Sequence, residues 1–269
     1  MLATTQNYIP VGSSEAGLCL TAENWQDAKV NALSFSLEFL LYKPGIALLK
    51  KIPSLSKYLG WPAAIILNAS SLKANREGTY LLKSPFDGSK TKVTAVELVE
   101  LIQHLNPDAV ILPKKILQDC PQIWAILNES IMPFFTAEEL SQHQPTQKHG
   151  VYFTDANDSL LAQWTHLPRY VIGDFNAESI RHLRIQGIEF VETDEPVKAG
   201  FHGKVYSQHG EIDLTNKDTE MQFEIIDSAC TCPVCTQQFT KAYFHHLIEH
   251  TPLLCQRFLI QHNVFWMAN

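Results

Sequence analysis

Three cysteines close together near the C-terminus constrain this chain more than any other feature. Cys230, Cys232 and Cys235 follow a C-x-C-x-x-C spacing, and Pro233 lies in the turn between them. Their sulfurs can converge with little loss of loop entropy, and zinc favours four tetrahedral thiolate or imidazole ligands. The alternative is a set of buried free thiols. We favour zinc, in a closed four-ligand site that supports structure and leaves no position for a reacting water.

The fourth ligand must come from the segment that follows this cysteine cluster. Our choice is His262, which lies beyond a helical run; the alternatives are His245, His246, His250 and Cys255. Cys19, Cys120 and Cys255 are otherwise expected to be small core residues.

Composition narrows the class of protein further. The chain has 269 residues and a formal net charge of -7, which argues against strong sequence-blind binding to nucleic acid and leaves only a local basic face open. It contains no apolar run of membrane-spanning length, and its N-terminus lacks the features of a signal peptide. We therefore expect a cytoplasmic protein with reduced thiols and no membrane partner.

Strand and helix patterns alternate along most of the chain. Short apolar runs predict buried strands near residues 63–68, 108–113, 150–155, 169–174 and 188–194, with helices between them. Asp87-Gly88 predicts a hairpin turn, Thr94 and Glu97 a helix capping box, and residues 200–218 a second hairpin. Residues 23–45 have apolar residues at helical and then mixed spacing. The pattern and length favour an α/β fold, a TIM-like (β/α)8 barrel that is either complete or incomplete, with a C-terminal zinc-binding subdomain.

The cysteine segment resembles the C-terminal signature of the tRNA-guanine transglycosylase (queuine/archaeosine tRNA-ribosyltransferase) family. The similarity extends over Thr240–Leu247 and the closing His262-Asn263, and it singles out His262 as the fourth zinc ligand. Earlier segments are similar as well: Pro10-Val11-Gly12, Tyr42–Gly45, Lys83–Ser89 and Arg169–Gly173. The resemblance implies a shortened, divergent member with a zinc-bearing barrel, and with material missing around residues 116–165.

Enzymes of this family exchange guanine in tRNA for a 7-deazaguanine, with one Asp as nucleophile and another as general acid/base. In the segment IEFVETDEPVKAG the nucleophile position falls on Glu192, and Asp194 is the alternative if the loop slips by two residues. A longer side chain disturbs near-attack geometry. The competing interpretation is a solvated acidic loop at a strand end.

Other expected site positions have lost their chemistry. The acid/base position is Asn68, which cannot titrate, and the base-recognition position is Lys114, which donates hydrogen bonds where a carboxylate accepts them. Gly150 is what remains of a Gln-Gly-Gly loop. We therefore predict a catalytically degenerate relative, in which these residues are doubtful substrate contacts.

Three functions remain to be separated. The first is a non-catalytic protein that binds tRNA or a catalytic relative, as a homodimer or heterodimer through the zinc subdomain and its aromatic residues, with Lys198, Lys204, Lys241 and Arg257 as a modest phosphate-contacting edge. The second is an active base-exchange glycosyltransferase with an altered substrate that uses Glu192 or Asp194. The third is a free-standing zinc-ribbon interaction module. We expect residues 1–200 to form the barrel and residues 201–269 the hairpin, the zinc subdomain and a closing helix.

Overall fold

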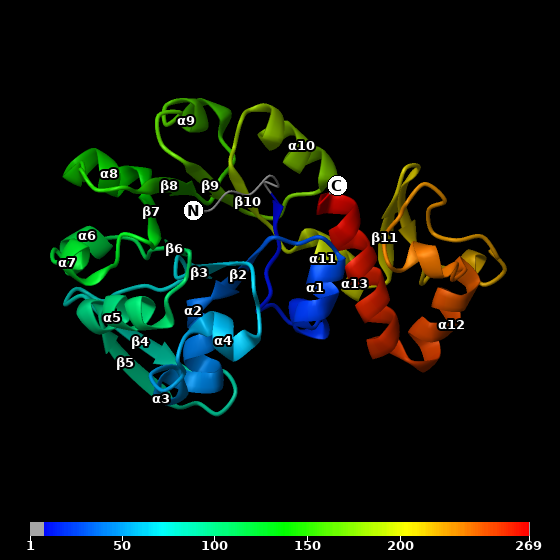
Figure 1. Ribbon diagram of the computed structural model, residues 1–269, viewed down its shortest axis with the longest axis horizontal. Helices are drawn as coiled ribbons and strands as arrows, with labels where there is room; N and C mark the ends of the chain where they lie inside the picture. Colours follow the sequence, from blue (N-terminus) through cyan, green and yellow to red (C-terminus); the bar gives the residue numbers. More distant parts are fainter. Residues whose placement is uncertain (1–7, 269) are drawn as a thin grey trace.

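Eight parallel strands form a barrel in the computed structural model, which describes residues 8–268 (Figure 1). Neighbouring strands follow the order β1-β10-β9-β8-β7-β6-β3-β2. Their bounds are β1 (Tyr8–Ile9), β2 (Ala32–Ser36), β3 (Ala64–Asn68), β6 (Ala109–Ile111), β7 (Met132–Thr136), β8 (Gly150–Phe153), β9 (Arg169–Ile172) and β10 (Phe190–Glu192). The predicted barrel architecture is confirmed.

The two ends of this sheet meet through a narrow contact beside β1. The Gly12 amide donates to the Ser34 carbonyl at 2.8 Å, and the Ser34 amide donates to the Pro10 carbonyl at 3.0 Å. Val11 and Ser34 thereby form a parallel bridge between the first strand and β2. All eight strand positions of the barrel are filled.

Helices follow the strands around the outside of the barrel. They are α1 (Ala22–Asp27), α2 (Leu37–Leu40), the π-helical turn η2 (Leu41–Gly45), α3 (Ile46–Leu49), α4 (Leu55–Leu59), α5 (Ala95–Leu105), α6 (Ile116–Asp119), α7 (Ile123–Ile126), α8 (Ala137–His143), α9 (Asp158–Ala162), α10 (Ala177–Ile185) and α11 (Glu195–Phe201), with the 3-10 turn η1 (Gly17–Cys19) before α1. Helices α6 to α9 are short, and the longest of them has seven residues. The barrel is therefore shortened in its helices and loops, while its strands are retained.

An antiparallel hairpin interrupts the connection between β3 and α5. It consists of β4 (Thr79–Lys83) and β5 (Lys90–Thr94), and the predicted Asp87-Gly88 turn lies at its tip. Thr94 ends the hairpin and caps α5: its hydroxyl accepts from the Glu97 amide, and the Glu97 carboxylate accepts from the Thr94 amide. The sequence predicted both features because each depends on a few adjacent residues.

Besides the two-residue β1, two barrel strands lie where no strand was predicted. Strand β2 lies within residues 23–45, and its five residues are too few to outweigh the helical spacing around them. Strand β7 contains Pro133, which lacks an amide proton and normally argues against a central strand. Both strands are flanked by others in the barrel, so the tertiary structure overrides the local signal.

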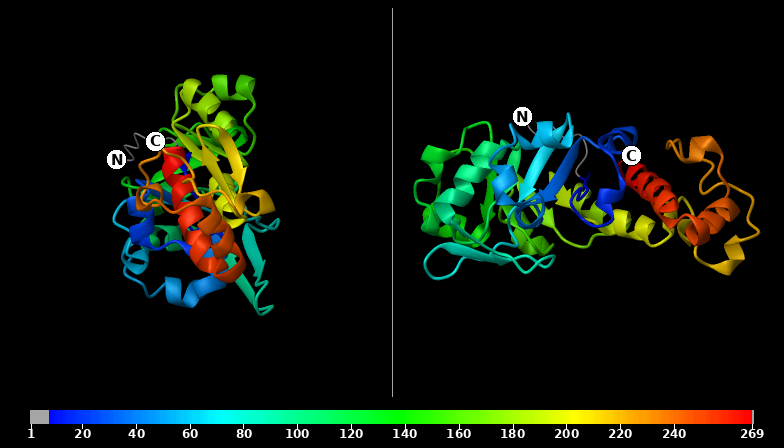
Figure 2. Two further views of the ribbon diagram at one scale, coloured as in Figure 1. Left: turned by 90° about the vertical axis from the view of Figure 1, so that its right-hand side faces the viewer. Right: turned by 90° about the horizontal axis from the view of Figure 1, so that it is seen from below.

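The C-terminal part forms one end of the elongated molecule (Figure 2). It contains the hairpin β11 (Lys204–Ser207) and β12 (Gly210–Asp213), the 3-10 turns η3 (Lys217–Thr219) and η4 (Cys235–Gln237), and the helices α12 (Lys241–His250) and α13 (Pro252–Ala268). Helix α13 packs along α11 of the barrel and also contacts α12 and β11. The hypothesis of a free-standing zinc-ribbon module is therefore wrong. Within residues 8–268, no helix has both the length and the apolar character needed to cross a bilayer.

Aromatic side chains fill the interior of the barrel. The rings of Phe134 and Tyr170 lie 5.3 Å apart, and those of Phe134 and Phe190 lie 5.7 Å apart. Gly150, the first residue of β8, faces the Phe134 ring, so the absence of a side chain makes room for the aromatic layer. A methyl group on Gly150 would overlap that ring and lie 2.9 Å from the Pro168 carbonyl.

Gly150→Ala should therefore destabilise the barrel by about 1–3 kcal/mol, the usual cost of overpacking. Urea unfolding of the two proteins measures this difference. Combining it with Phe134→Leu should cost less than the sum of the two single changes, because the smaller side chain vacates the overlapped space. If the two losses of stability were strictly additive, overlap with the Phe134 ring would not be the reason that Gly150→Ala destabilises the barrel.

Candidate metal centre and barrel site

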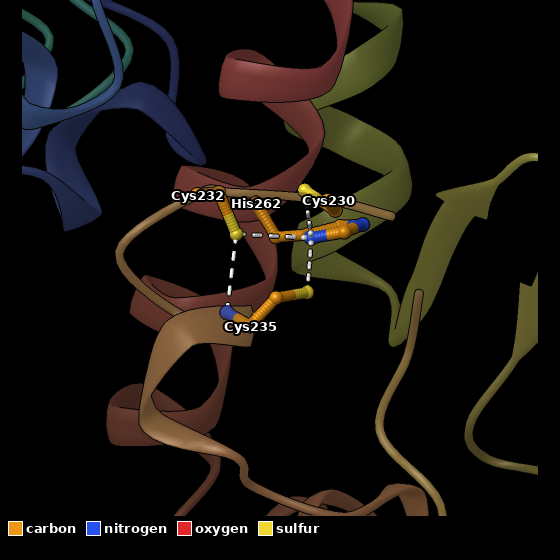
Figure 3. Close-up of side chains that lie close together, drawn as sticks. All are labelled: Cys230, Cys232, Cys235 and His262. Atoms are coloured by element: carbon orange, nitrogen blue, oxygen red, sulfur yellow. Dashed lines mark hydrogen bonds between the residues drawn. The ribbon is translucent and has the colours of Figure 1, made fainter. Parts of the chain in front are cut away.

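The C-terminal cysteines and one histidine converge on a single point (Figure 3). The Nδ1 atom of His262 lies 3.9 Å from Cys230 Sγ, 3.3 Å from Cys232 Sγ and 3.4 Å from Cys235 Sγ. All four ligand atoms lie within 4.8 Å of one another. The structure therefore assembles a Cys3His cluster that could hold a metal ion.

Two further contacts orient these ligands. The Nε2 atom of His262 lies 2.7 Å from the Tyr206 carbonyl oxygen, which can only accept, so this nitrogen carries the proton and Nδ1 presents its lone pair to the sulfurs. The Cys235 amide donates to Cys232 Sγ at 3.2 Å, and this contact helps to position that sulfur. Sequence reasoning missed the Tyr206 carbonyl, because a backbone acceptor has no side-chain signature.

The alternative fourth ligands have other surroundings. His245 is buried, and its Nδ1 lies 2.8 Å from the Leu214 carbonyl. His246 and His250 are exposed and stack on each other, with ring centroids 4.3 Å apart. Cys255 is buried and donates to the Phe244 carbonyl, and burial raises the pKa of its thiol to about 12. None of these four residues belongs to the Cys3His cluster.

Asn263, the next residue, connects this cluster to the barrel. Its side chain is fully buried; Nδ2 donates to the Pro196 carbonyl at 3.0 Å and to the Lys204 carbonyl at 2.9 Å, while Oδ1 accepts from the Tyr206 amide at 3.0 Å. Helix α13 is thereby tied to α11 of the barrel and to β11 of the subdomain. The His-Asn pair thus combines a possible metal ligand with a bridge between the two parts.

A second candidate site lies inside the barrel, at the carboxyl ends of the strands. Glu192 ends β10 and Asn68 ends β3, and the Asn68 amide donates to Glu192 Oε1 at 2.7 Å. The hydroxyl of Tyr170, from β9, donates to Glu192 Oε2 at 2.7 Å. The structure therefore brings together the two positions that the resemblance assigned to the nucleophile and the acid/base.

The orientation of Asn68 follows from its neighbour. Asn68 Oδ1 accepts from the Ser70 amide at 3.0 Å and from the Ser70 hydroxyl at 2.7 Å. Because a backbone amide can only donate, the oxygen must face Ser70 and the NH2 group must face Glu192. Ser70 thus fixes Asn68 as a hydrogen-bond donor to the carboxylate.

Glu192 is 5 % exposed, so the interpretation of a solvated acidic loop is wrong for this residue. Burial raises the pKa of its carboxyl group above the ordinary value, and the hydrogen bonds from Tyr170 and Asn68 offset part of that rise. A ribose carbon can reach the carboxylate only if the side chains that cover it move. Tyr170 was missed as a partner of Glu192, although a tyrosine in a buried strand usually needs a polar contact.

Asp194, the alternative nucleophile, lies outside this network. It precedes α11 and is partly buried, and its Oδ1 accepts from the Ser14 hydroxyl at 2.9 Å. Burial raises its pKa to about 6, against the effects of Ser14 and of the Lys198 charge. Ser14 gave no signal in the sequence because the two residues are far apart in the chain.

The other two predicted substrate contacts, Lys114 and Gly150, do not belong to the hydrogen-bond network around Glu192. Lys114 is an exposed residue in the turn that follows β6, at the carboxyl-end face of the barrel. Gly150 begins β8 and therefore lies at the opposite, amino end of its strand. The placement of Gly150 beneath Phe134 gives no support to a role in substrate binding, and its role as a doubtful contact stays a prediction.

A parallel-stranded barrel with polar residues at the carboxyl ends of its strands, joined to a Cys3His cluster, defines the class of molecule. Comparison with known proteins then shows which proteins this chain resembles. The family described as queuine tRNA-ribosyltransferase matches residues 149–269.

Individual relatives extend the similarity beyond that region. Queuine tRNA-ribosyltransferase of Dehalococcoides mccartyi (strain 195) is 23 % identical over 318 aligned residues, covering 98 % of this chain and 80 % of the relative. The Thermotoga neapolitana protein of the same name is 23 % identical and covers 98 % of this chain and 85 % of the relative. The Clostridium acetobutylicum protein is 31 % identical over 105 residues, which are 38 % of this chain and 28 % of the relative. The chain is therefore similar to queuine tRNA-ribosyltransferases along nearly its whole length, and its C-terminal part matches the family model.

Replacement of Glu192 should change how stability depends on pH. Folding raises the pKa of the Glu192 carboxyl group above its value in the unfolded chain, near 4.5. Such a group stabilises the folded protein at pH values below the unfolded-state pKa, and this contribution is lost as the pH rises through the folded-state pKa. Glu192→Gln should therefore raise the free energy of unfolding at pH 7.5 and flatten its decline above pH 4.5, since a neutral amide can still accept from Asn68.

Chemical denaturation at several pH values between 4 and 8 would measure this effect, with exposed Glu178→Gln as the matched control. An unchanged pH dependence in the Glu192 variant would show that this carboxyl group titrates normally.

Proposed function

We propose that this protein is a catalytically degenerate tRNA-guanine transglycosylase-like protein, which acts by binding tRNA or a catalytic relative. The observation that carries the proposal is the buried pair Glu192–Asn68, at 2.7 Å. Exchange of a base at C1′ requires an accessible carboxylate nucleophile and a second group that can transfer a proton. Here the nucleophile position is covered, and the acid/base position is an amide that holds no transferable proton.

The Cys3His cluster has the donor set of a structural zinc site. Three sulfurs and one imidazole nitrogen fill a tetrahedral coordination shell, and the proton on His262 Nε2 is held by a carbonyl, which leaves Nδ1 free to coordinate. When bound, zinc would cross-link the cysteine segment to α13 and supply structure without chemistry. We therefore propose a structural zinc held by Cys230, Cys232, Cys235 and His262.

The aromatic face of the zinc subdomain supports binding to another protein chain. Phe239 contacts Tyr243 and Phe258, with ring centroids 5.3 and 5.5 Å apart, so part of this cluster packs within the subdomain. Tyr243 is nevertheless 42 % exposed, and His246 is exposed beside it. Exposed aromatic residues at a rigid helix are frequent anchors of interfaces, which supports a homodimer or a heterodimer with a catalytic relative.

Asp194 supports the alternative of an active base-exchange enzyme with an altered substrate. It is less buried than Glu192, and its pKa of about 6 would leave it ionised at neutral pH. In that case Lys114, also at the carboxyl-end face, would favour a base that carries acceptors or negative charge. The Asp194→Asn variant separates this alternative from one based on Glu192.

Purified protein should contain one zinc ion per chain, measured by elemental analysis. His262→Ala should lose the metal and lower the free energy of unfolding by about 5 kcal/mol or more, because binding of a structural metal is coupled to folding. Cys19→Ala, outside the cluster, serves as the control and should retain the metal. A His262 variant with full zinc content would assign the fourth ligand elsewhere.

The proposed lack of catalysis is tested by base exchange. Zinc-loaded protein, incubated with unmodified tRNA and labelled guanine or 7-deazaguanines, should incorporate no label above the level of Glu192→Gln and Asp194→Asn. A relative with both catalytic Asp residues provides the positive control. Incorporation that disappears in either variant would disprove the proposal and identify that carboxylate as the nucleophile.

A further inference from the structure

The charges of this acidic protein are strongly segregated along the chain. Residues 43–92 contain nine Lys and Arg residues but only two Asp and Glu residues, a net charge of +7. The rest of the chain therefore carries a net charge of -14. The segment covers η2, α3, α4, β3 and the hairpin β4–β5, so the positive charge is concentrated on two neighbouring connections of the barrel.

The register of the hairpin places three lysines on one face. Lys83 pairs directly with Lys90, and Leu81 pairs with Lys92. These four side chains are exposed, while Tyr80, Leu82 and Val93 point to the other face and are buried. Like charges directly opposite each other destabilise a β-ladder, so the Lys83–Lys90 pair lowers the stability of the hairpin on its own.

Two more lysines extend this face from the preceding connection. Lys43 lies over the Phe86 ring at the tip of the hairpin, with Nζ 3.6 Å from the ring centroid. Lys50 follows α3, and it acts electrostatically on Glu97 together with Lys92. Figure 1 shows α3 beside one end of the hairpin. We call Lys43, Lys50, Lys83, Lys90, Lys92 and the half-exposed Phe86 the basic hairpin face.

The lysines of the basic hairpin face are not neutralised by ion pairs. Among residues 8–268, none of the five lies within 4.0 Å of a carboxylate oxygen. Glu97, on which Lys50 and Lys92 act electrostatically, accepts hydrogen bonds from the Thr94 amide and hydroxyl, and Asp87 accepts one from the Ser89 hydroxyl. The five ammonium groups are therefore available to an external anion.

The lysines first considered for phosphate contact behave differently. Lys198 pairs with Asp174 and Glu195, Lys204 with Glu211, and Lys241 with Glu224. Each of these contacts lies between 2.7 and 3.5 Å. That edge offers little uncompensated positive charge.

We propose that the basic hairpin face binds the phosphate backbone of a folded RNA. Uncompensated lysines on a local face, with an exposed aromatic ring among them, match the requirements for phosphate contacts and stacking on an unpaired base. The choice of RNA over other polyanions rests on the proposed function. The electrostatic complementarity of this face to a polyanion is independent of that proposed function.

The position of this face fits that partner. The hairpin lies in the connection after β3, whose last residue is Asn68, and Lys43 lies in the connection after β2. Both connections therefore leave the barrel at the carboxyl-end face, where Glu192 and Asn68 lie. An RNA held by the hairpin would extend over the region in which relatives of this fold class place their active sites.

Binding of an unmodified tRNA transcript tests the proposal, with fluorescence anisotropy measured between 50 and 250 mM salt for the zinc-loaded full chain. The triple variant Lys83→Gln, Lys90→Gln, Lys92→Gln should bind at least tenfold more weakly near 100 mM salt. Its slope of log K against log salt should be smaller by about 2 to 3, since each lost phosphate contact removes roughly one unit. Arginine at the same three positions should preserve binding.

A matched control removes the same number of exposed lysine charges elsewhere: Lys29→Gln, Lys148→Gln, Lys217→Gln should bind like the wild type. Lys83→Glu provides a second readout, because it creates an opposite-charge pair with Lys90 and should leave the Tm unchanged or higher while weakening RNA binding. A role in hairpin structure alone would lower the Tm instead.

Three outcomes would overturn the proposal. The first is no tRNA binding by the wild type at 50 mM salt, and the second is an equal loss of tRNA affinity in the hairpin and control triple variants. The third is that the hairpin lysines are needed to bind phosphatidylserine vesicles or an acidic protein but not to bind tRNA. Base exchange is assayed separately on the same preparations. Label incorporation would contradict the non-catalytic function and leave the assignment of the RNA-binding face standing, so the two failures are distinguishable.

Discussion

The fully buried Asn263 holds the two parts of this protein in one structure. Its amide group spans α11, β11 and α13 through three hydrogen bonds, so no part of this buried polar side chain is left unpaired. Because His262 precedes it on the same helix turn, the position of the Cys3His cluster relative to the barrel depends on the same contact. A metal in the cluster would fix α13 from the subdomain side, while Asn263 fixes it from the barrel side.

In the interior of the barrel, the position that the resemblance assigns to the nucleophile belongs to a closed hydrogen-bond network. Glu192 remains an acid at the end of β10, but Asn68 and Tyr170 each donate to one of its oxygens, and Ser70 locks the amide of Asn68 in place. Removing one partner of such a buried group costs more than the bond itself contributes, because the other partner stays buried and unsatisfied. The network therefore resists single substitutions: Asp at position 68 would place two carboxylates in contact.

Local patterns predicted much of this fold, and long-range contacts account for what they missed. Five of the eight barrel strands, both hairpins, the Thr94 cap and the cysteine cluster depend on residues close in sequence, and the signature around His262-Asn263 identified the fourth member of the cluster. Strand β7 was missed because Pro133 suppresses the strand signal, although the neighbouring strands supply its pairing. Tyr170 and Ser14 were missed because their carboxylate partners, Glu192 and Asp194, are brought to them only by the pairing of β10 with β9 and β1.

The distribution of charge determines where the proposed RNA can bind. A net charge of -7 on the whole chain excludes strong non-specific attraction to a polyanion, so any binding must be local and oriented. The connections after β2 and β3 supply that orientation, since they carry the uncompensated lysines and the second also ends β3 at Asn68. Acidic surfaces elsewhere would repel the same polyanion and hold it to this end of the barrel. In the proposed function, the barrel therefore directs an RNA to one face without a proton-transfer group at position 68.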